Sequence, residues 1–218
     1  MKKSPDKKLI FYTSNTPNGL KISIFLHEAQ LAHSKIYLDL STGVQRSPEY
    51  LAINPNGKIP AIVDNEEDMT VFESGAILTY LDDKYKVFKS ASMKENLSIQ
   101  QWLNFQIAGV GPMMGQLWWF LHGSKTQNLE AITRYTNESL RLLGVIERQL
   151  TITPYLAGNH YSIVDIATFS WLRTWEELNL DLTTFPYVIE WLDKINQRPA
   201  VKKAILANSQ PKNEEILA

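Results

Sequence analysis

The chain has 218 residues, with 22 basic and 23 acidic side chains, a formal net charge of −1 and no cysteine. Balanced charge offers no broad field for nucleic acid or an anionic membrane, and the missing cysteine excludes disulfides and a cysteine nucleophile. Four scattered histidines show no metal-ligand spacing, and no apolar run is long enough for a signal peptide or a membrane span, so we expect a cytoplasmic protein without a metal.

The chain up to about residue 90 alternates strand-like and helix-like segments. Leu9–Tyr12 is a short apolar and aromatic run that predicts a buried strand. Thr16 then offers an N-cap hydroxyl, Pro17 suits the first helical position, and apolar residues follow at helical spacing. This segment therefore predicts a strand, a loop and a helix.

Three more strands and a helix are expected next. Ile36–Leu40 predicts a strand parallel to the first. Ile59–Val63 and Met69–Phe72 predict a hairpin around the acidic turn 64–68, and a helix begins at Ser74. The expected order is βαβ followed by ββα.

Nearly everything after residue 90 has helical periodicity. Apolar residues recur every three or four positions between Leu103 and Leu121, and Pro112 is expected to bend that helix. Further helices are expected over 132–150 and 188–195. Ser162, with Asp165 three residues later, predicts a capping box in which Asp replaces the usual Glu or Gln.

The change of pattern predicts two domains. We expect an α/β domain over residues 8–86 and an all-helical domain over residues 93–207. The ends of the chain, 1–7 and 208–218, are expected to be loose tails.

Three segments carry a resemblance to a known family: Thr16-Pro17-Asn18-Gly19, Asn54–Ala61 and Phe72–Leu78. In this order and spacing, the chain resembles the cytosolic glutathione transferases, most closely the bacterial nu class. That class is similar to the transferase-like domain of a fungal prion-forming nitrogen regulator. The resemblance implies a thioredoxin-like α/β domain followed by an all-α helical bundle, a homodimer, and glutathione as cosubstrate.

Glu73 and Ser74 are candidates for binding the γ-glutamyl end of glutathione. Ser74 at a helix start can hold a carboxylate with backbone N–H groups, and Glu73 can take the ammonium. An N-cap serine beside a solvated glutamate explains the pair equally well from the residues alone. The resemblance favours binding.

The Ile59–Pro60 bond is a candidate cis peptide, since X–Pro bonds adopt cis at small cost. From the residues alone, a trans proline that opens an edge strand is the more frequent arrangement. The resemblance implies the cis form, with the backbone of Ile59 paired to the cysteinyl unit of glutathione.

Asn18 and Thr16 are the candidate catalytic residues. Both lie where the first helix begins, and a thiolate gains from N–H dipoles and a positioned donor at such a place. Helix capping alone also explains them. The resemblance implies that Asn18 first, and Thr16 second, contact the glutathione sulfur, whereas Tyr12 is expected to be a core residue.

Other candidates rest on the resemblance. Gln45 and Arg134 match positions that bind the glycyl end of glutathione or a second glutathione, although a lone Arg is ordinarily a solvated helix residue. Lys58 is a weaker candidate of the same kind. One or two of the following side chains are expected to line a second-substrate pocket: Met113, Trp118, Trp119, Trp171 and Trp175.

The resemblance implies two activities. The favoured one is glutathione-dependent reduction of a small disulfide, or of an organic hydroperoxide, with two glutathiones bound and oxidised glutathione released. The other is conjugation of glutathione to an electrophile. A non-enzymatic binding or regulatory module and a carrier of apolar compounds remain alternatives.

Overall fold

The computed structural model describes residues 8–88 and 92–216, and these fall into two units. The first unit contains the described residues 8–88 and 198–216, and the second contains residues 92–197. The segment 1–7, expected to be a loose tail, lies outside the described residues.

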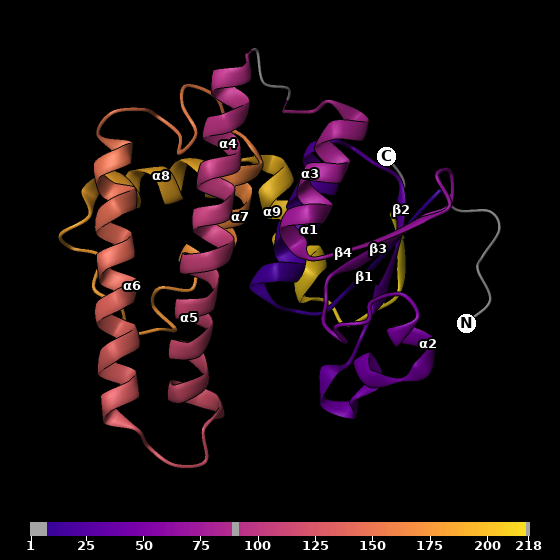
Figure 1. Cartoon of the computed structure of the whole chain (residues 1–218), viewed down its shortest axis with the longest axis horizontal. Helices are drawn as coiled ribbons and strands as arrows, with labels where there is room; N and C mark the ends of the chain where they lie inside the picture. The colour runs from indigo at the N-terminus through magenta and orange to yellow at the C-terminus, as the bar shows by residue number, and fades with distance from the viewer. Residues whose placement is uncertain (1–7, 89–91, 217–218) are drawn as a thin grey trace. The chain divides into compact units, whose positions relative to one another are not determined.

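The first unit is built on a five-stranded mixed sheet in the order β4-β3-β1-β2-β5 (Figure 1). Strand β2 runs parallel to β1, while β3 is antiparallel to β1 and the edge strands β4 and β5 are antiparallel to their neighbours. The strands are β1 (Leu9–Thr13), β2 (His33–Tyr37), β3 (Ala61–Asp64), β4 (Met69–Phe72) and β5 (Glu214–Ile216).

Helices cover the two faces of this sheet (Figure 1). On one face α1 (Pro17–Glu28) packs beside α3 (Ser74–Tyr85) and α9 (Pro199–Ser209). On the other face lie two 3₁₀ turns, Leu40–Thr42 and Val44–Arg46, and the short helix α2 (Pro48–Leu51). Tyr50 of α2 packs in a core cluster with alternate residues of β1 and β3, as the pleat of a strand requires.

Strand β2 begins three residues earlier than predicted and ends at Tyr37 rather than Leu40. Its residues Ser34–Tyr37 pair with Ile10–Thr13 of β1. Lys35 is buried, and its Nζ donates to the carbonyl oxygens of Ala207 at 2.8 Å and Gln210 at 3.2 Å. These acceptors lie more than 170 residues away in sequence. The local sequence pattern therefore could not predict that the strand begins with the polar residues His33, Ser34 and Lys35.

The C-terminal segment differs from the expected domain boundaries. Helix α9, expected in the helical domain, packs on α1 in the first unit through an Arg198–Glu28 ion pair of 2.6 Å. The segment expected to be a loose tail contains β5, which pairs with β2. The α/β unit therefore includes α9 and β5, which come after the helical unit in the sequence.

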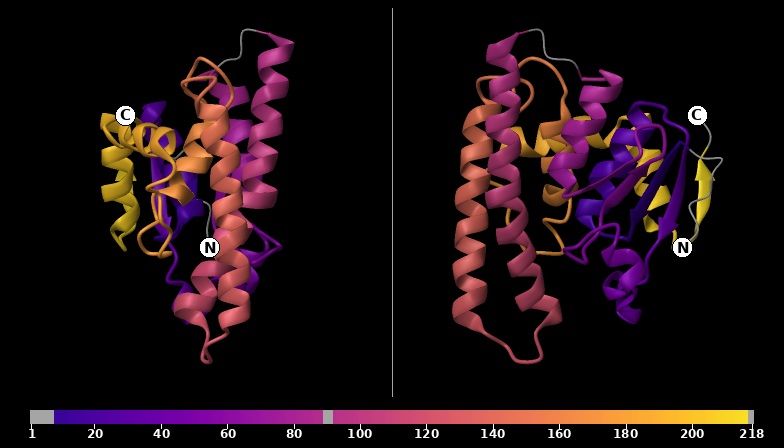
Figure 2. Two further views of the ribbon diagram at one scale, coloured as in Figure 1. Left: turned by 90° about the vertical axis from the view of Figure 1, so that its left-hand side faces the viewer. Right: turned by 45° about the vertical axis from the view of Figure 1, so that its right-hand side comes forward.

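The second unit is helical, as predicted. Helices α4 (Met93–Phe105) and α5 (Gly111–Trp118) are joined by a π-helical turn over Gln106–Val110, and another π-helical turn covers Trp119–Gly123. Pro112 has no N–H to continue an α-helical ladder, and the first π-helical turn ends two residues before it, at Val110. The other helices are α6 (Leu129–Leu150), which lies beside α5 (Figure 2), α7 (Ile163–Leu172) and α8 (Pro186–Asn196).

The predicted capping box at the start of α7 is confirmed. Ser162 accepts from the helix backbone, and Asp165 Oδ2 accepts from the Ser162 N–H at 3.0 Å. Asp165 Oδ1 also accepts from the Leu156 N–H and from Trp191 Nε1. Burial raises the pKa of the Asp165 carboxyl against these hydrogen bonds, and we assign the residue a structural role.

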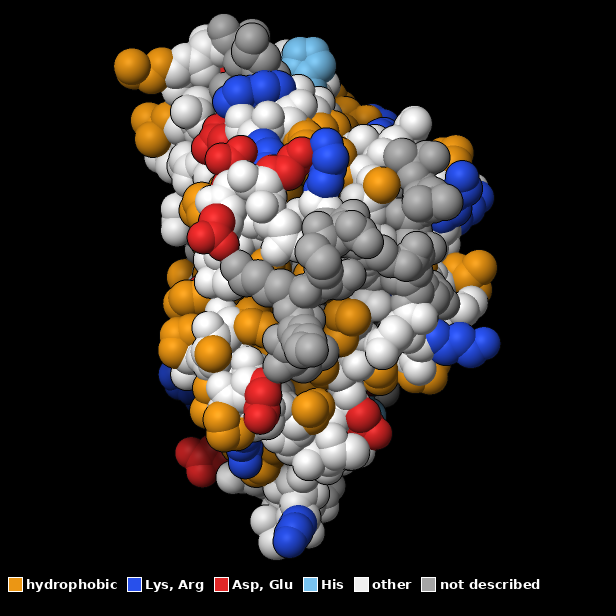
Figure 3. All heavy atoms as spheres, turned by 90° about the vertical axis from the view of Figure 1, so that its right-hand side faces the viewer, with side chains coloured by type: hydrophobic (Ala, Val, Ile, Leu, Met, Phe, Trp, Pro, Cys, Tyr) orange, Lys and Arg blue, Asp and Glu red, His pale blue; other side chains and the backbone are white. Residues whose placement is uncertain are grey.

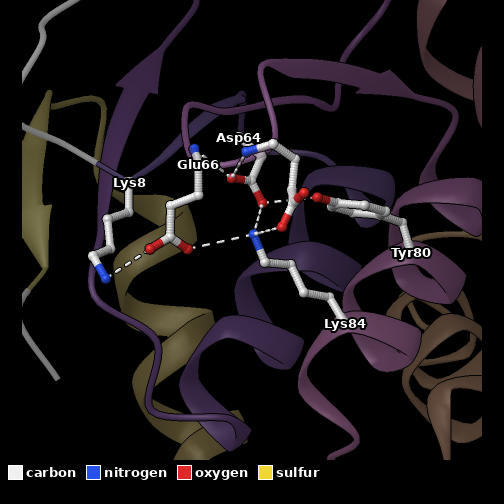
Figure 4. A network of polar contacts seen from close by, with 6 residues as sticks. Lys8, Asp64, Glu66, Tyr80 and Lys84 are labelled. Carbon is white, nitrogen blue, oxygen red and sulfur yellow. Dashed lines mark hydrogen bonds and ion pairs between the residues drawn. The ribbon is translucent and has the colours of Figure 1, made fainter.

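A polar network ties the β3–β4 hairpin to α3 (Figure 4). Asp64, at the end of β3, accepts from Lys84 Nζ at 2.6 Å and from the Tyr80 hydroxyl at 2.8 Å. Glu66 pairs with Lys84 at 3.4 Å and with Lys8 at 2.7 Å. Lys84 of α3 and Lys8, the residue before β1, therefore offset part of the negative charge of the acidic turn.

Charge is mixed on the face of the protein that Figure 3 shows. Among the described residues on the face in Figure 3, acidic and basic side chains are interspersed. Within residues 8–88 and 92–216, no helix is both long and apolar enough to cross a membrane.

Candidate functional site

Helix α1 begins as the sequence predicts. Thr16 is the N-cap residue, and its Oγ1 accepts the Gly19 N–H at 3.1 Å, while Pro17 occupies the first turn. Because the Thr16 oxygen acts as acceptor in the cap, its hydroxyl proton can be donated to a ligand. Thr16 and Asn18 are half-buried at the positive end of the helix dipole.

Close packing behind this helix start requires a glycine. A Cβ at Gly19 would lie 2.3 Å from Thr13 Oγ1 and 2.6 Å from the Ser14 carbonyl oxygen. Asn208 of α9 lies on the same side, with its Nδ2 3.4 Å from the Thr16 carbonyl oxygen. The loop between β1 and α1 is therefore held between its own strand and the last helix.

Two hydrogen bonds converge on one carbonyl in the loop that leads into β3. The Lys58 carbonyl oxygen accepts from the Tyr50 hydroxyl at 2.7 Å and from Asn54 Nδ2 at 2.6 Å. The next peptide bond, Ile59–Pro60, is cis, as the resemblance implies. The role of the Ile59 backbone in binding stays a prediction.

Helix α3 begins at an unusual backbone conformation. Glu73 has φ 68° and ψ 119°, a backbone conformation that is uncommon for a non-glycine residue. Residues with such unusual backbone angles are often found at functional sites. Its side chain makes no cap hydrogen bond to the helix, so first-turn N–H groups of α3 face a place where an anion can bind. Ser74, the first helical residue, is buried there.

Side-chain contacts join three stretches of the first unit. Lys21 of α1 donates from Nζ to Ser74 Oγ at 3.1 Å. Asn56 donates from Nδ2 to Glu73 Oε1 at 3.2 Å, and its own N–H donates to Asn54 Oδ1 at 2.9 Å. The start of α1, the loop before β3 and the start of α3 therefore form one polar region.

Gln45 lies in the 3₁₀ turn Val44–Arg46 of the same unit. Its Nε2 donates to the Leu40 carbonyl oxygen at 3.3 Å, while its buried Oε1 accepts no hydrogen bond from the described residues. A buried amide oxygen without a donor can accept one from a ligand. Lys58 is exposed in the loop before β3.

Tyr12 is a core residue, as expected. It is 5% exposed and packs edge-to-face against Tyr50, with the ring centroids 5.8 Å apart. Burial raises the pKa of its hydroxyl, which disfavours the phenolate.

Sequence reasoning missed Lys21, Asn56 and Asn208. A lysine between Leu20 and Ile22 in the apolar part of α1 is a signal that could have revealed Lys21, because buried lysines need a partner. Asn56 and Asn208 give no comparable local signal, since their partners come from other elements.

The remaining candidates lie in the second unit. Arg134 is exposed on α6. Trp118 donates from Nε1 to Glu177 Oε1 at 2.6 Å, and Trp171 lies so close to α5 that a Cβ at Gly115 would be 3.2 Å from its ring. Their part in binding a substrate stays a prediction. Across the described parts of both units, no cluster of three His, Asp or Glu side chains could hold a metal ion.

The fold and this polar region define a class of protein. Residues 8–83 match the family described as "Glutathione S-transferase, N-terminal domain", and residues 110–199 match "Glutathione S-transferase, C-terminal domain". The chain belongs to the glutathione S-transferase family.

Similar proteins include a disulfide-bond oxidoreductase and Ure2-type transferases. The disulfide-bond oxidoreductase YfcG of Escherichia coli is 44% identical over 200 residues, which cover 89% of this chain and 93% of YfcG. The transferase URE2P6 of Phanerochaete chrysosporium, solved with oxidized glutathione, is 35% identical with a TM-score of 0.90, covering 96% of this chain and 100% of that one. A Pseudomonas fluorescens family member, solved with two glutathione bound, is 37% identical with a TM-score of 0.85, covering 94% of each chain.

Proposed function

We propose that this protein is a glutathione-dependent thiol–disulfide oxidoreductase that reduces small disulfides with two bound glutathiones. The observation that carries the proposal is the connected polar region at the starts of α1 and α3. The similarity to YfcG, named a disulfide-bond oxidoreductase, supports this activity, and relatives solved with glutathione or oxidized glutathione support the ligand.

Each part of one glutathione has a proposed partner. Its γ-glutamyl carboxylate binds Ser74 and the N–H groups of α3, its ammonium binds Glu73, and its cysteinyl backbone pairs with Ile59. Gln45 binds the glycyl end. We assign Arg134 to a glycyl carboxylate or to the second glutathione, since guanidinium groups pair well with carboxylates.

The thiol of this glutathione lies at the start of α1. Asn18 and the Thr16 hydroxyl donate to the sulfur, and together with the helix dipole they lower the thiol pKa toward neutral pH. Thiolate is the nucleophile in thiol–disulfide exchange, so these groups raise the reactive fraction.

The reaction then runs in two balanced steps. The bound thiolate attacks one sulfur of the substrate disulfide, a mixed disulfide forms, and the other sulfur leaves as a thiolate that takes a proton from water. A second glutathione thiolate attacks the sulfur of the bound glutathione in the mixed disulfide, which forms oxidised glutathione and releases the second substrate sulfur as a thiolate that takes a proton from water. The resolving thiol must come from glutathione because the chain has no cysteine. Organic hydroperoxides are a further proposed oxidant class.

Conjugation of glutathione to electrophiles is the second candidate function. It uses the same thiolate, and similarity to "Glutathione S-transferase 2" of Schizosaccharomyces pombe, 37% identical over 205 residues, favours it. We place the protein in the cytoplasm, where glutathione keeps thiols reduced. A homodimer is also part of the proposal, and gel filtration tests it.

One assay pair tests the proposed function. With glutathione, glutathione reductase and NADPH, the protein should reduce 2-hydroxyethyl disulfide faster than it conjugates 1-chloro-2,4-dinitrobenzene. Conjugation as the faster reaction would favour the second candidate. Disulfide reduction and conjugation both no faster than in buffer would contradict the enzyme proposal and favour a binding module.

A further inference from the structure

Lys21 is a buried charged side chain behind the proposed glutathione site. It is 2% exposed, although lysine is almost never fully buried without a partner. It follows Asn18 by three residues in α1, so the two side chains lie on the same face of the helix. Long helical side chains lean toward the helix N-terminus, which brings the Lys21 stem toward the turn that contains Asn18.

The contact between Lys21 and Ser74 fixes the roles of donor and acceptor. In its charged form Lys21 has three donors and no acceptor, so Ser74 Oγ must then accept the 3.1 Å hydrogen bond. The Ser74 hydroxyl proton then points away from Lys21 and can be donated to a carboxylate. Lys21 therefore orients the group that we assign to the γ-glutamyl carboxylate.

In the protein without ligand, Lys21 loses its proton more readily than an exposed lysine does. Burial lowers the pKa of its ammonium to about 7, and the nearby Glu73 carboxylate acts in the opposite direction. Glu73 is the charged side chain that faces Lys21 from α3. From α9, the Ala204 carbonyl oxygen accepts from Ser23 and Asn208 donates to the Thr16 carbonyl oxygen, and neither α9 group carries a charge.

A ligand carboxylate at Ser74 would change this balance. It adds a second negative charge close to Nζ, which favours the charged form of the lysine. At a pH where Lys21 is partly neutral, binding must then be accompanied by uptake of a proton from solvent, and affinity must fall as pH rises.

We propose that Lys21 is a positioning residue for glutathione, which orients the Ser74 hydroxyl and couples binding of the γ-glutamyl carboxylate to proton uptake by the lysine. This inference rests on the proposed glutathione site but not on the identity of the second substrate. It concerns binding, so it applies equally to disulfide reduction and to conjugation.

The test is isothermal titration calorimetry with S-methylglutathione, whose blocked thiol removes the sulfur from the titration. Wild type is titrated about one unit below and about one unit above pH 7, in pairs of buffers with different ionisation enthalpies. We expect net proton uptake and an affinity about fivefold weaker at the higher pH. The ligand amine titrates in the same range, so variants supply the comparison.

Lys21→Met keeps the length of the side chain and removes its charge, and Lys21→Arg keeps a charge that does not titrate. Lys21→Met should bind about tenfold more weakly at the lower pH and lose the lysine-dependent part of the pH profile. Lys21→Arg should recover affinity without the extra proton uptake. Lys86→Met, at a lysine whose side chain is 58% exposed, should match wild type.

Circular dichroism and thermal melting establish that each variant is folded before titration. The inference would be overturned if wild type binds without proton uptake and a folded Lys21→Met protein binds as tightly as wild type at both pH values. The proposed glutathione site would then remain supported. Wild type that fails to bind S-methylglutathione would overturn the proposed function itself.

Discussion

At the scale of single residues, Asn18 is the side chain with the most direct proposed role in chemistry. It is half-buried in the first turn of α1, beside the Thr16 cap. A neutral amide donor can stabilise a thiolate through a hydrogen bond without adding a group that titrates near neutral pH.

Asn18→Ala should lower the rate of glutathione-dependent reduction of 2-hydroxyethyl disulfide at least tenfold, about 1.4 kcal/mol of transition-state stabilisation. The apparent pKa of the bound thiol, measured from the pH–rate profile, should rise because the thiolate loses a donor. Asn104→Ala, at an exposed asparagine of α4, is the matched control and should retain the wild-type rate. A rate for Asn18→Ala within twofold of wild type would argue against contact with the sulfur.

The residues of the site that sequence could predict are those with a local signature. Thr16 stands before Pro17 at a helix start, and a hydroxyl with that spacing predicts the observed cap. Lys21 has no such signature, because Ser74 lies 53 residues away. The supporting contacts of this site cross between elements, so they could be found only in the fold.

At the scale of elements, the tight junction between β1 and α1 positions the proposed thiol site. Gly19 permits this junction because its Cα approaches the Thr13 side chain and the Ser14 carbonyl. Any larger residue must move the loop or the helix.

Gly19→Ala should destabilise the protein by about 2–3 kcal/mol, because an added methyl group meets backbone as well as side-chain atoms. Gly144→Ala is the matched substitution inside α6, where an added Cβ meets nothing closer than 3.7 Å. It should stabilise by about 0.5–1 kcal/mol, since alanine favours helix over glycine. Urea denaturation measures both. A Gly19→Ala protein as stable as Gly144→Ala would contradict close packing of Gly19 against Thr13 and Ser14.

The polar network between the β3–β4 hairpin and α3 is expected to stabilise the fold. Lys84→Met removes the ammonium from Asp64, whose side chain is 1% exposed, and should cost about 3 kcal/mol at neutral pH because it leaves a buried charge unpaired. Arg141→Met breaks an exposed ion pair of similar length, 2.7 Å, and should leave the urea midpoint nearly unchanged.

The effect of Lys84→Met should depend on pH. Burial raises the pKa of Asp64, but hydrogen bonds from Lys84 and Tyr80 outweigh burial and hold the pKa below its ordinary value of 3.8. The Asp64 carboxylate therefore contributes fully to the free energy of unfolding above pH 3.8, its ordinary pKa. That contribution is lost as the pH falls through the lower pKa of the folded state. The stability difference between wild type and Lys84→Met should shrink in acid, and a constant difference would exclude this pair as its source.

Elements with strong periodicity were predictable, and those defined by distant partners were not. Strand β4 and the start of α3 match their expected bounds because the hairpin and helix signals are local. The start of β2 and the placement of α9 depend on each other through Lys35, so neither could be derived from its own segment.

At the scale of the whole molecule, the absence of cysteine determines how the proposed reaction must be completed. Every thiol in it belongs to glutathione or to the substrate, so the protein contributes binding, orientation and electrostatic stabilisation. The start of α1 remains a helix start, as the sequence indicated, and in the proposed function it also holds the reactive sulfur.

A crystal of the protein soaked in oxidised glutathione would show directly where the two glutathione units bind. We predict density for both halves of the disulfide, with one γ-glutamyl group at Ser74 and Glu73, its cysteinyl backbone along Ile59, and its sulfur within hydrogen-bond distance of Asn18. Density for oxidised glutathione away from the starts of α1 and α3, or no density at saturating concentration, would contradict the proposed glutathione site.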